Sequence, residues 1–408
     1  MKLEDVTIRP MTEADLEAVA QLRSIGFGRT KEKTMAALQN DPRYNLSHII
    51  VAEHAGQVIG TTTIFPVKMW LSGVPVNVGA VAGVAVLPEF RRQGVAAKMM
   101  EVTVRRSFDE GYALSALFPF SHHYYSKFGY RTVSDLHAYR INRHNLNLVS
   151  DAVNKVRPFN PDDLRMIRVM YKGQLTWHNG WLTRSDEWWD RLVKSWSKIM
   201  VFDNDGMIEG YYAYNIHIDQ DDEPVLNIKE FFAASGTAYQ ALFHFLAEQT
   251  EAEIIEYLAP ADTLLRYSLR QPIAHQAQNH GWIFNDLCYV TPGPMARIIN
   301  LPKALTSRFY TRGISGERIL KVTDPLIPEN ETPLVFRLVD GRAETRPADG
   351  GKPQIETDVA TLSQILCGYM KAIEAYRLDL FRASEDTCSW LDKIIVDTPL
   401  YIQAGDWF

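Results

Sequence analysis

The 408-residue chain has few cysteines, no long apolar segment and no excess of positive charge. Its three cysteines, Cys288, Cys367 and Cys388, are widely spaced and odd in number, so they indicate neither a disulfide framework nor a zinc site. We expect them to be buried free thiols. The net charge of −6 argues against a partner made of nucleic acid, because a protein that binds phosphates along a strand normally has a basic face.

The chain also lacks the features of a secreted or membrane protein. Residues 1–5 contain no apolar stretch of the kind found in signal peptides, and no apolar run approaches the ~20 residues of a membrane span. We therefore expect a cytoplasmic protein with no membrane partner. The histidines are scattered, and the adjacent His122 and His123 would diverge by about 100° on a helix, so no metal site is expected.

Residues 84–97 are the most informative stretch, because they join an apolar strand to a helix through a short basic loop. Val84–Leu87 is apolar, and Pro88 cannot donate a ladder hydrogen bond, so the strand should end there. Arg91–Gly94 then lies at a helix N-terminus, where unpaired backbone N–H groups and the helix dipole attract anions. The glycine allows close approach of a ligand, and the two arginines add positive charge. The segment predicts a diphosphate site.

The spacing of Arg91, Gly94 and Ala96 after a strand resembles the acetyl-CoA pyrophosphate loop of the GCN5-related N-acetyltransferases (GNAT). The surrounding residues agree with this resemblance. Thr12 reads as an N-cap with Asp15 three residues later. The other elements expected here are a strand at 7–10, a helix through 16–25, an antiparallel meander at 49–53, 58–70 and 74–87, and a strand at 113–118.

The next part of the chain repeats the first. Residues 156–164 echo 8–16 at an offset of 148 positions, and residues 199–210 parallel 50–60 in the same order. The copy departs at 233–239, which contains no arginine and cannot reproduce the basic loop. We therefore expect a degenerate second domain with a structural role, and one cofactor site per chain.

The last part of the chain differs from both copies. After Pro292, Gly293 and Pro294, which break any regular element, strands are expected at 295–299 and 334–338 and turns at Gly341 and at 350–351. Asp358 precedes an expected amphipathic helix that carries Leu362, Ile365, Leu366 and Tyr369 on one face.

This domain order resembles the Eis (enhanced intracellular survival) family over essentially the whole chain. The resemblance implies an α/β (α+β) protein with two tandem GNAT-type mixed-sheet domains and a C-terminal domain like sterol carrier protein. The boundaries expected are 1–149 for the catalytic domain, 150–293 for the degenerate domain and 294–408 for the last domain. It also implies a homo-oligomer, a hexamer.

Acetyl transfer from acetyl-CoA to a primary amine needs a base and an acid. An amine with a pKa of about 10.4 is protonated at neutral pH, so a base or a water relay must take its proton. CoA leaves as a thiolate whose pKa is about 8.5, and an acid assists its departure. Tyr125, followed by Phe128, Gly129 and Tyr130, resembles the family's proton donor; the adjacent Tyr124 is a rival.

The base implied by the resemblance is the free C-terminal carboxylate of Phe408. Trp407 and Phe408 fit insertion into the first domain, because two large aromatics at a frayed end would expose apolar area. Asp406 is a competing base, and acidic side chains of the first domain stay open as further alternatives.

The resemblance also maps the acetyl-CoA site, with Gln93 standing where many members carry a third basic residue. The residues implied are Val84, Ala85, Val86, Arg91, Arg92, Gln93, Gly94, Val95, Ala96, Ala97, Phe120 and Ser121. The acceptor is a small-molecule or peptide amine: aminoglycosides, polyamines, peptides and lysine side chains all stay open, since its pocket would be shaped by loops such as 27–35. Two other functions stay open as well, an inactive acetyl-CoA-binding scaffold and a lipid or small-molecule carrier acting through the last domain.

Overall fold

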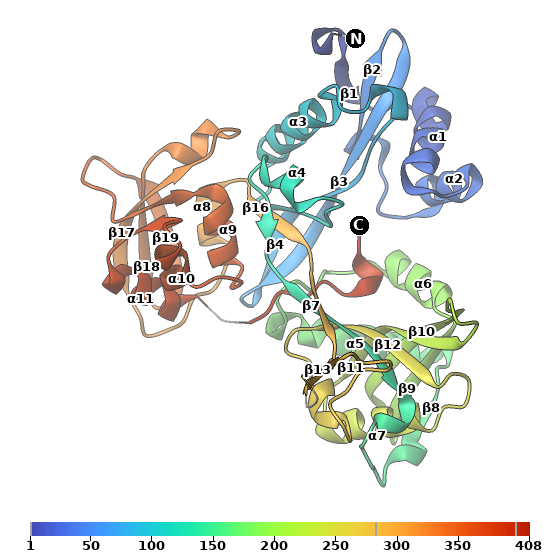
Figure 1. Ribbon diagram of the computed structural model, residues 1–408. Helices are drawn as coiled ribbons and strands as arrows, with labels where there is room; N and C mark the ends of the chain where they lie inside the picture. The colour runs from blue at the N-terminus through green and yellow to red at the C-terminus, as the bar shows by residue number, and fades with distance from the viewer. Residues whose placement is uncertain (1, 282–283, 396–397) are drawn as a thin grey trace.

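A computed structural model describes residues 2–281, 284–395 and 398–408 (Figure 1). The described residues form two seven-stranded mixed sheets and a five-stranded sheet, each covered by helices, with a small two-stranded hairpin beside the second sheet. The three sheets form separate lobes, and the C-terminus lies between the first lobe and the second (Figure 1). The mixed α/β class expected from the sequence is confirmed.

The first sheet has the strand order β1-β2-β3-β4-β5-β16-β6. Its strands are β1 (Thr7–Pro10), β2 (Ile49–His54), β3 (Gln57–Leu71), β4 (Val74–Val86), β5 (Leu114–Leu117), β16 (Met295–Ile298) and β6 (Arg131–Thr132). Its helices are α1 (Leu16–Phe27), α2 (Lys31–Asn40), α3 (Val95–Asp109) and α4 (His122–Ser126). The strand and helix positions expected in the first 118 residues are confirmed.

The second sheet has the corresponding order β8-β9-β10-β11-β12-β7-β15. Its strands are β8 (Val156–Pro158), β9 (Lys198–Asn204), β10 (Met207–Ile218), β11 (Pro224–Ala233), β12 (Ile254–Pro260), β7 (Asp135–Asn142) and β15 (Tyr289–Pro292). Its helices are α5 (Leu164–Gln174), α6 (Asp186–Ser195) and α7 (Gly236–Ala247), and the hairpin is β13 (Asn279–His280) with β14 (Phe284–Asn285).

The duplication expected from the sequence is visible in matching ion pairs. Arg9 contacts Asp15 at 2.7 Å, and Arg157 contacts Asp163 at 2.8 Å, each across the first turn that follows the first strand of its sheet. Both aspartates also accept the backbone N–H of the N-cap residue, at 2.8 Å from Thr12 and 2.7 Å from the second domain's N-cap. Two sheets of one topology that carry the same capping network are two copies of one fold.

The strands at the two domain boundaries lie in other sheets than the sequence analysis assigned. β7, assigned there to the first domain, pairs with β12 and β15 in the second sheet. β16, assigned to the last domain, pairs with β5 and β6 in the first sheet. The two crossing segments lie side by side, since Gly293 donates its N–H to the carbonyl of Ser134 at 2.8 Å. The sequence analysis expected boundaries at 149/150 and 293/294. The chain instead passes from one sheet to the other between β6 and β7, and returns between β15 and β16.

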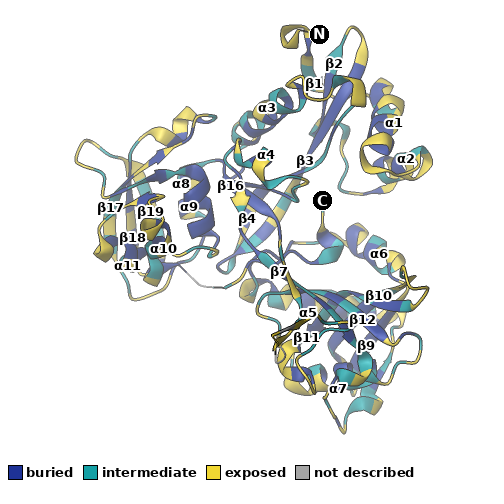
Figure 2. Cartoon of the chain, viewed as in Figure 1, coloured by how far each residue is buried: buried dark blue, intermediate teal, exposed yellow. Residues whose placement is uncertain are grey.

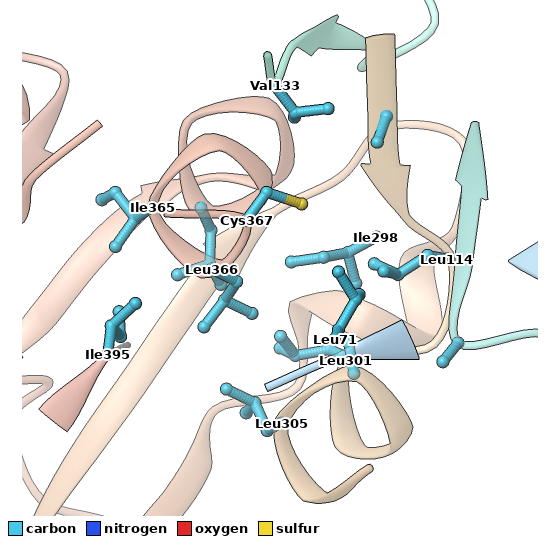
Figure 3. Close-up of a cluster of buried hydrophobic side chains, with 14 of the residues drawn as sticks. Leu71, Leu114, Val133, Ile298, Leu301, Leu305, Ile365, Leu366, Cys367 and Ile395 are labelled. Atoms are coloured by element: carbon cyan, nitrogen blue, oxygen red, sulfur yellow. The ribbon is translucent and has the colours of Figure 1, made fainter. Parts of the chain in front are cut away.

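The third lobe holds the five-stranded sheet, in the order β19-β18-β17-β20-β21. Its strands are β17 (Gly316–Thr323), β18 (Leu334–Val339), β19 (Arg342–Pro347), β20 (Ile355–Asp358) and β21 (Phe381–Arg382), and its helices are α8 (Leu301–Thr306), α9 (Val359–Leu366), α10 (Ala372–Arg377) and α11 (Glu385–Ile394). One apolar cluster continues from this lobe into the first sheet, where Leu71 and Leu114 lie near Ile298 and Leu366 (Figure 3).

Two expectations from the sequence were wrong, one for α9 of this lobe and one for Cys288, which precedes β15 of the second sheet. Every residue of α9 is buried, so the helix is not amphipathic, as its dark colour shows in Figure 2. Tyr369 lies beyond its end, more than a third exposed, and donates a hydrogen bond to Asp135 at 3.0 Å. The three cysteines are free thiols, but only Cys367 and Cys388 are buried; Cys288 is partly exposed.

Candidate active site

The candidate site begins where β4 and β5 separate. The two strands pair in parallel from Val78–Leu114 to Val81–Leu117, and β4 then continues to Val86 while β5 ends. Gly83 has a φ of +62°, and the pairing of β4 with β3 shifts register at the same place. Such a bulge bends a strand and redirects it. The edge of β4 from residue 82 onward is therefore open toward β5 within the described chain.

The basic loop follows directly and leads to the N-terminus of α3. Arg92 and Gly94 both have positive φ, +60° and +88°, and no side chain caps the first turn of the helix. The backbone N–H groups of this turn are thus free of side-chain acceptors, as an anion site requires. Residues 91–94 are exposed.

The side chains of this loop divide into two groups. Arg91 donates from Nε to the carbonyl of Val86 at 3.0 Å, and Gln93 donates to the carbonyl of Glu89 at 2.8 Å, so both hold the loop. Arg92 has no partner among the described residues, which leaves its guanidinium available for a phosphate.

The equivalent helix of the second domain, α7, is closed to phosphate. Ser235 caps it, since its hydroxyl accepts the N–H of Ala238 at 3.1 Å. The same hydroxyl donates to the carboxylate of Glu209 at 2.8 Å, which places a negative charge at the helix N-terminus. A carboxylate there satisfies the dipole and repels a second anion. This geometry supports the expectation of a degenerate second domain.

The two tyrosines proposed as proton donors lie on α4, beside the point where the strands part. Tyr125 is 3% exposed and belongs to one apolar cluster with Val81 and Leu117, the last residues that pair β4 with β5. Burial raises the pKa of Tyr125 above its ordinary value. Burial and then the charge of Glu101 raise the pKa of Tyr124 to about 12. Both phenols are therefore neutral at physiological pH.

Residues around α4 hold these rings in place. Phe120 is 69% exposed, and its ring centroid lies 5.3 Å from that of Tyr124 and 5.1 Å from that of Tyr125. The turn after the helix is fixed from β16, because fully buried Arg297 donates to the carbonyl of Phe128 at 2.6 Å and pairs with Asp324 at 2.6 Å. β16 thus supports the turn that follows the helix with the two tyrosines.

The C-terminal segment reaches the same region from the third lobe. The Trp407 and Phe408 rings lie 5.1 and 5.3 Å from that of Phe118, the residue after β5. Arg43 donates to the carbonyl of Trp407 at 3.0 Å. The last residue is thus at the open end of β5, although Trp407 stays 38% exposed, more than the sequence analysis expected.

Asp406 cannot be the open base that the sequence analysis allowed. Its carboxylate is fully buried, contacts Arg184 at 2.8 Å and accepts the indole N–H of Trp188 at 2.9 Å. Arg184 also pairs with buried Glu230 at 2.6 Å, and Tyr211 donates to the same glutamate. Asp406 therefore anchors the C-terminal segment to the second domain.

A cavity of about 580 Å³ lies between the first and second domains, next to this anchor. Loop residues 42–48 and part of β3 line one side, and residues 182–188 of the second domain line the other. Sequence reasoning did not foresee this cavity or the part that Arg184 and Trp188 take in it. No local pattern marks these two residues, because their shared partner Asp406 is more than 200 residues away.

The described residues contain neither a candidate metal-ligand cluster nor a candidate membrane-spanning helix. No cluster of three or more His, Cys, Asp or Glu side chains is placed to hold a metal ion. No helix in the described ranges is long and apolar enough to cross a membrane.

Comparison with known families agrees with the two-copy architecture. Models described as acetyltransferase (GNAT) domain match residues 7–133 and 180–298, and a model described as sterol carrier protein domain matches 301–403. Over 344 residues the chain is 25% identical to N-acetyltransferase Eis of Mycobacterium tuberculosis (strain CDC 1551 / Oshkosh) and of Mycobacterium bovis (strain BCG / Pasteur 1173P2), with 79% of this chain and 80% of each relative covered.

Solved structures share the complete fold. A GCN5-related N-acetyltransferase from Anabaena variabilis superimposes with a TM-score of 0.86 at 18% identity, covering 99% of this chain and 100% of that one. Eis1 from Mycobacterium abscessus gives 0.78 at 19% identity, covering 98% and 100%. The chain belongs to the Eis-like acetyltransferases, with two acetyltransferase (GNAT) domains followed by a sterol carrier protein domain.

Proposed function

We propose that the chain transfers the acetyl group of acetyl-CoA to a primary amine by direct attack, at the open end of β4 and β5. The observation that carries this proposal is the convergence of four parts at one place: the separated strands, the uncapped helix N-terminus, the buried Tyr125 and the chain's last residue. GNAT acetyltransferases use acetyl-CoA, and the residues present fit it.

The cofactor residues have distinct roles in this proposal. The backbone of Val84–Val86 holds the acetyl-pantetheine arm along the open strand edge. Backbone N–H groups of Gly94–Ala97 and the guanidinium of Arg92 hold the pyrophosphate. Arg91 and Gln93 shape the loop from within, through the hydrogen bonds to Val86 and Glu89. Phe120 and Ser121 flank the arm at the start of α4.

The reaction needs three proton transfers. The carboxylate of Phe408 takes a proton from the ammonium, directly or through water, and the free amine attacks the thioester carbon. The carbon–sulfur bond then breaks, and Tyr125 gives its proton to the leaving sulfur. The second proton of the amine nitrogen passes to the Tyr125 phenolate, directly or through water, which leaves a neutral amide, CoA thiol and a neutral tyrosine. Because burial raises the pKa of Tyr125, the phenol is protonated at neutral pH and its proton is available when the sulfur departs.

The inter-domain cavity is the proposed acceptor site. Lys68 lines it, together with Arg43, which pairs with Asp41 at 3.0 Å, and its carboxylate Asp406 is paired with Arg184. Positive neighbours lower the pKa of a bound ammonium and so favour the neutral amine that attacks. The acceptor class stays a small-molecule or peptide amine. A homohexamer and a cytoplasmic location stay predictions, the first from the family resemblance and the second from the sequence.

Two variants test the proposed roles by release of CoA thiol over a panel of amines. Tyr125→Phe should lower kcat by about 100-fold or more, the usual contribution of a general acid, with little change in acetyl-CoA affinity. A Gly-Ser extension after Phe408 should abolish turnover, while the same dipeptide added at the N-terminus should not. Unchanged turnover in the phenylalanine variant, or full activity with an extended C-terminus, would contradict the corresponding role.

A further inference from the structure

The second domain keeps an opening where the first domain has its cofactor cleft. β11 and β12 pair in parallel from Val225–Ile254 to Ile228–Tyr257 and pair no further. A cavity of about 280 Å³ lies beyond this point. Its walls come from the end of β11, the end of β12, the loop after β12, and residues 398–403 of the C-terminal segment. The structural role assigned to this domain from the sequence does not explain an open cavity.

The walls of this second-domain pocket are rich in aromatic rings. Trp177, Trp181, Tyr239, Tyr257 and Tyr401 line it together with two phenylalanines of β11. Trp177 is 75% exposed, an unusual state for an indole. Aromatic faces carry partial negative charge, so rings that surround a cavity favour a cation inside it.

The polar groups of the pocket point to the same chemistry. Asp262 is the formally charged lining residue, it is exposed, and it has no partner within the described ranges. His178 stacks on Trp181 with ring centroids 4.2 Å apart, and its Nδ1 lies 3.0 Å from the carbonyl of Gln174. That carbonyl requires a proton on Nδ1, which leaves Nε2 as an acceptor.

An anion such as CoA does not fit this pocket. The helix N-terminus beside it, on α7, is already occupied by Ser235 and the carboxylate of Glu209. Glu209 and Asp262 together give the region a negative sign, whereas the corresponding loop of the first domain carries two arginines. Each domain has such an opening, but the charged residues beside the two openings are of opposite sign.

The C-terminal segment forms one wall of the pocket. Tyr401 donates its hydroxyl to the carbonyl of Leu258 at 3.0 Å. Gln403 lines the cavity, and its Oε1 is buried without a hydrogen-bond partner. A buried amide oxygen without a donor is destabilising, so the fold alone leaves the hydrogen-bonding capacity of this side chain unused.

We propose that the second-domain pocket binds a small organic cation, held by the aromatic walls and by the carboxylate of Asp262. The pocket is separate from the acetyl-CoA cleft and from the inter-domain cavity. Its ligand contacts the segment that ends at Phe408, five residues after Gln403.

Choline and its uncharged isostere 3,3-dimethylbutan-1-ol test this proposal by isothermal titration calorimetry on the full chain. The two probes have nearly the same shape, so the ratio of their dissociation constants reports the charge. We expect choline to bind at least tenfold more tightly, and Asp262→Asn to reduce choline binding about tenfold. Asp151→Asn, an exposed change of the same charge outside the pocket, should leave it unaltered.

Two results would overturn the proposal: equal binding of the two probes, or a choline affinity that Asp262→Asn does not change. A competition experiment then shows which domain binds choline. Saturating acetyl-CoA should not displace choline, and displacement would assign choline to the first domain's cleft instead. Because no arm depends on turnover, the outcome is independent of the catalytic roles proposed above.

Discussion

The ion pairs that anchor Asp406 allow a quantitative prediction about the C-terminal segment. Arg184, Glu230 and Asp406 have side chains that are 0%, 1% and 0% exposed, so one positive and two negative charges share a buried site. Asp406→Asn leaves the Arg184–Glu230 pair neutral and intact. Arg184→Met leaves two buried carboxylates with no cation between them.

The two variants should therefore differ in cost. Asp406→Asn weakens charge-assisted hydrogen bonds from Arg184 and from Trp188, a loss of about 1.5–3 kcal/mol. That loss corresponds to a roughly 10- to 100-fold lower equilibrium constant for docking of the segment. Breaking a buried ion pair from one side costs about 3–5 kcal/mol, so Arg184→Met should be the more severe change.

Hydrogen exchange of residues 400–408 and urea denaturation measure these two effects. We expect Asp406→Asn to reduce protection of the segment with a small change in global stability, and Arg184→Met to lower the free energy of unfolding as well. Asp386→Asn, an exposed change on α11, is the matched control. If Arg184→Met proves no more destabilising than Asp406→Asn, the charge argument is wrong and shape alone holds the segment.

Three other predictions follow from the geometry. Equilibrium dialysis should find one acetyl-CoA per chain, and Arg92→Ala should weaken it, whereas two sites per chain would contradict the closed α7 terminus. Because burial raises the pKa of Tyr125, kcat should show no alkaline loss below a pH of about 10; a falling limb near pH 8 would oppose its role as acid. Arg9 holds the pKa of Asp15 below its usual range, so this pair stabilises the folded state above about pH 4. Its contribution to the free energy of unfolding is lost as the pH falls through the lowered pKa. Urea titrations of Asp15→Asn should converge on the parent chain in acid, and a constant difference would refute the linkage.

Local patterns explain which parts of the fold were accessible from the sequence. The capping box at Thr12 and the loop at 91–94 each depend on residues within a few positions of one another. Propensity and spacing therefore predict them. The duplicated domain was detected for the same reason, since its echo at 156–164 repeats a local cap rather than a long-range contact.

Long-range pairing explains what was missed. Nothing in 135–142 or 295–298 distinguishes a strand that stays in its own sheet from one that crosses to the neighbouring sheet. The β16–β5 register joins residues about 180 positions apart, as Ile298 with Leu114 shows. The role of Asp406 depends on Arg184, 222 positions away. From the sequence alone, an acidic residue beside the C-terminus is equally compatible with a catalytic base and with a structural anchor.

The two crossings of the chain between the sheets explain why the short C-terminal segment can line clefts in both domains. The first GNAT-type sheet is completed by β16, which follows the whole second sheet in the chain, so the chain crosses from the first sheet to the second and back again. The C-terminal segment meets that crossing at Leu400, whose carbonyl accepts the hydroxyl of Ser134. After this contact the segment continues to Tyr401, which lines the second-domain pocket, and to Phe408, which packs at the end of β5. Any rotation of one domain against the other must therefore move the terminal carboxylate relative to Tyr125, so the mechanism that we propose depends on the relative position of the two domains.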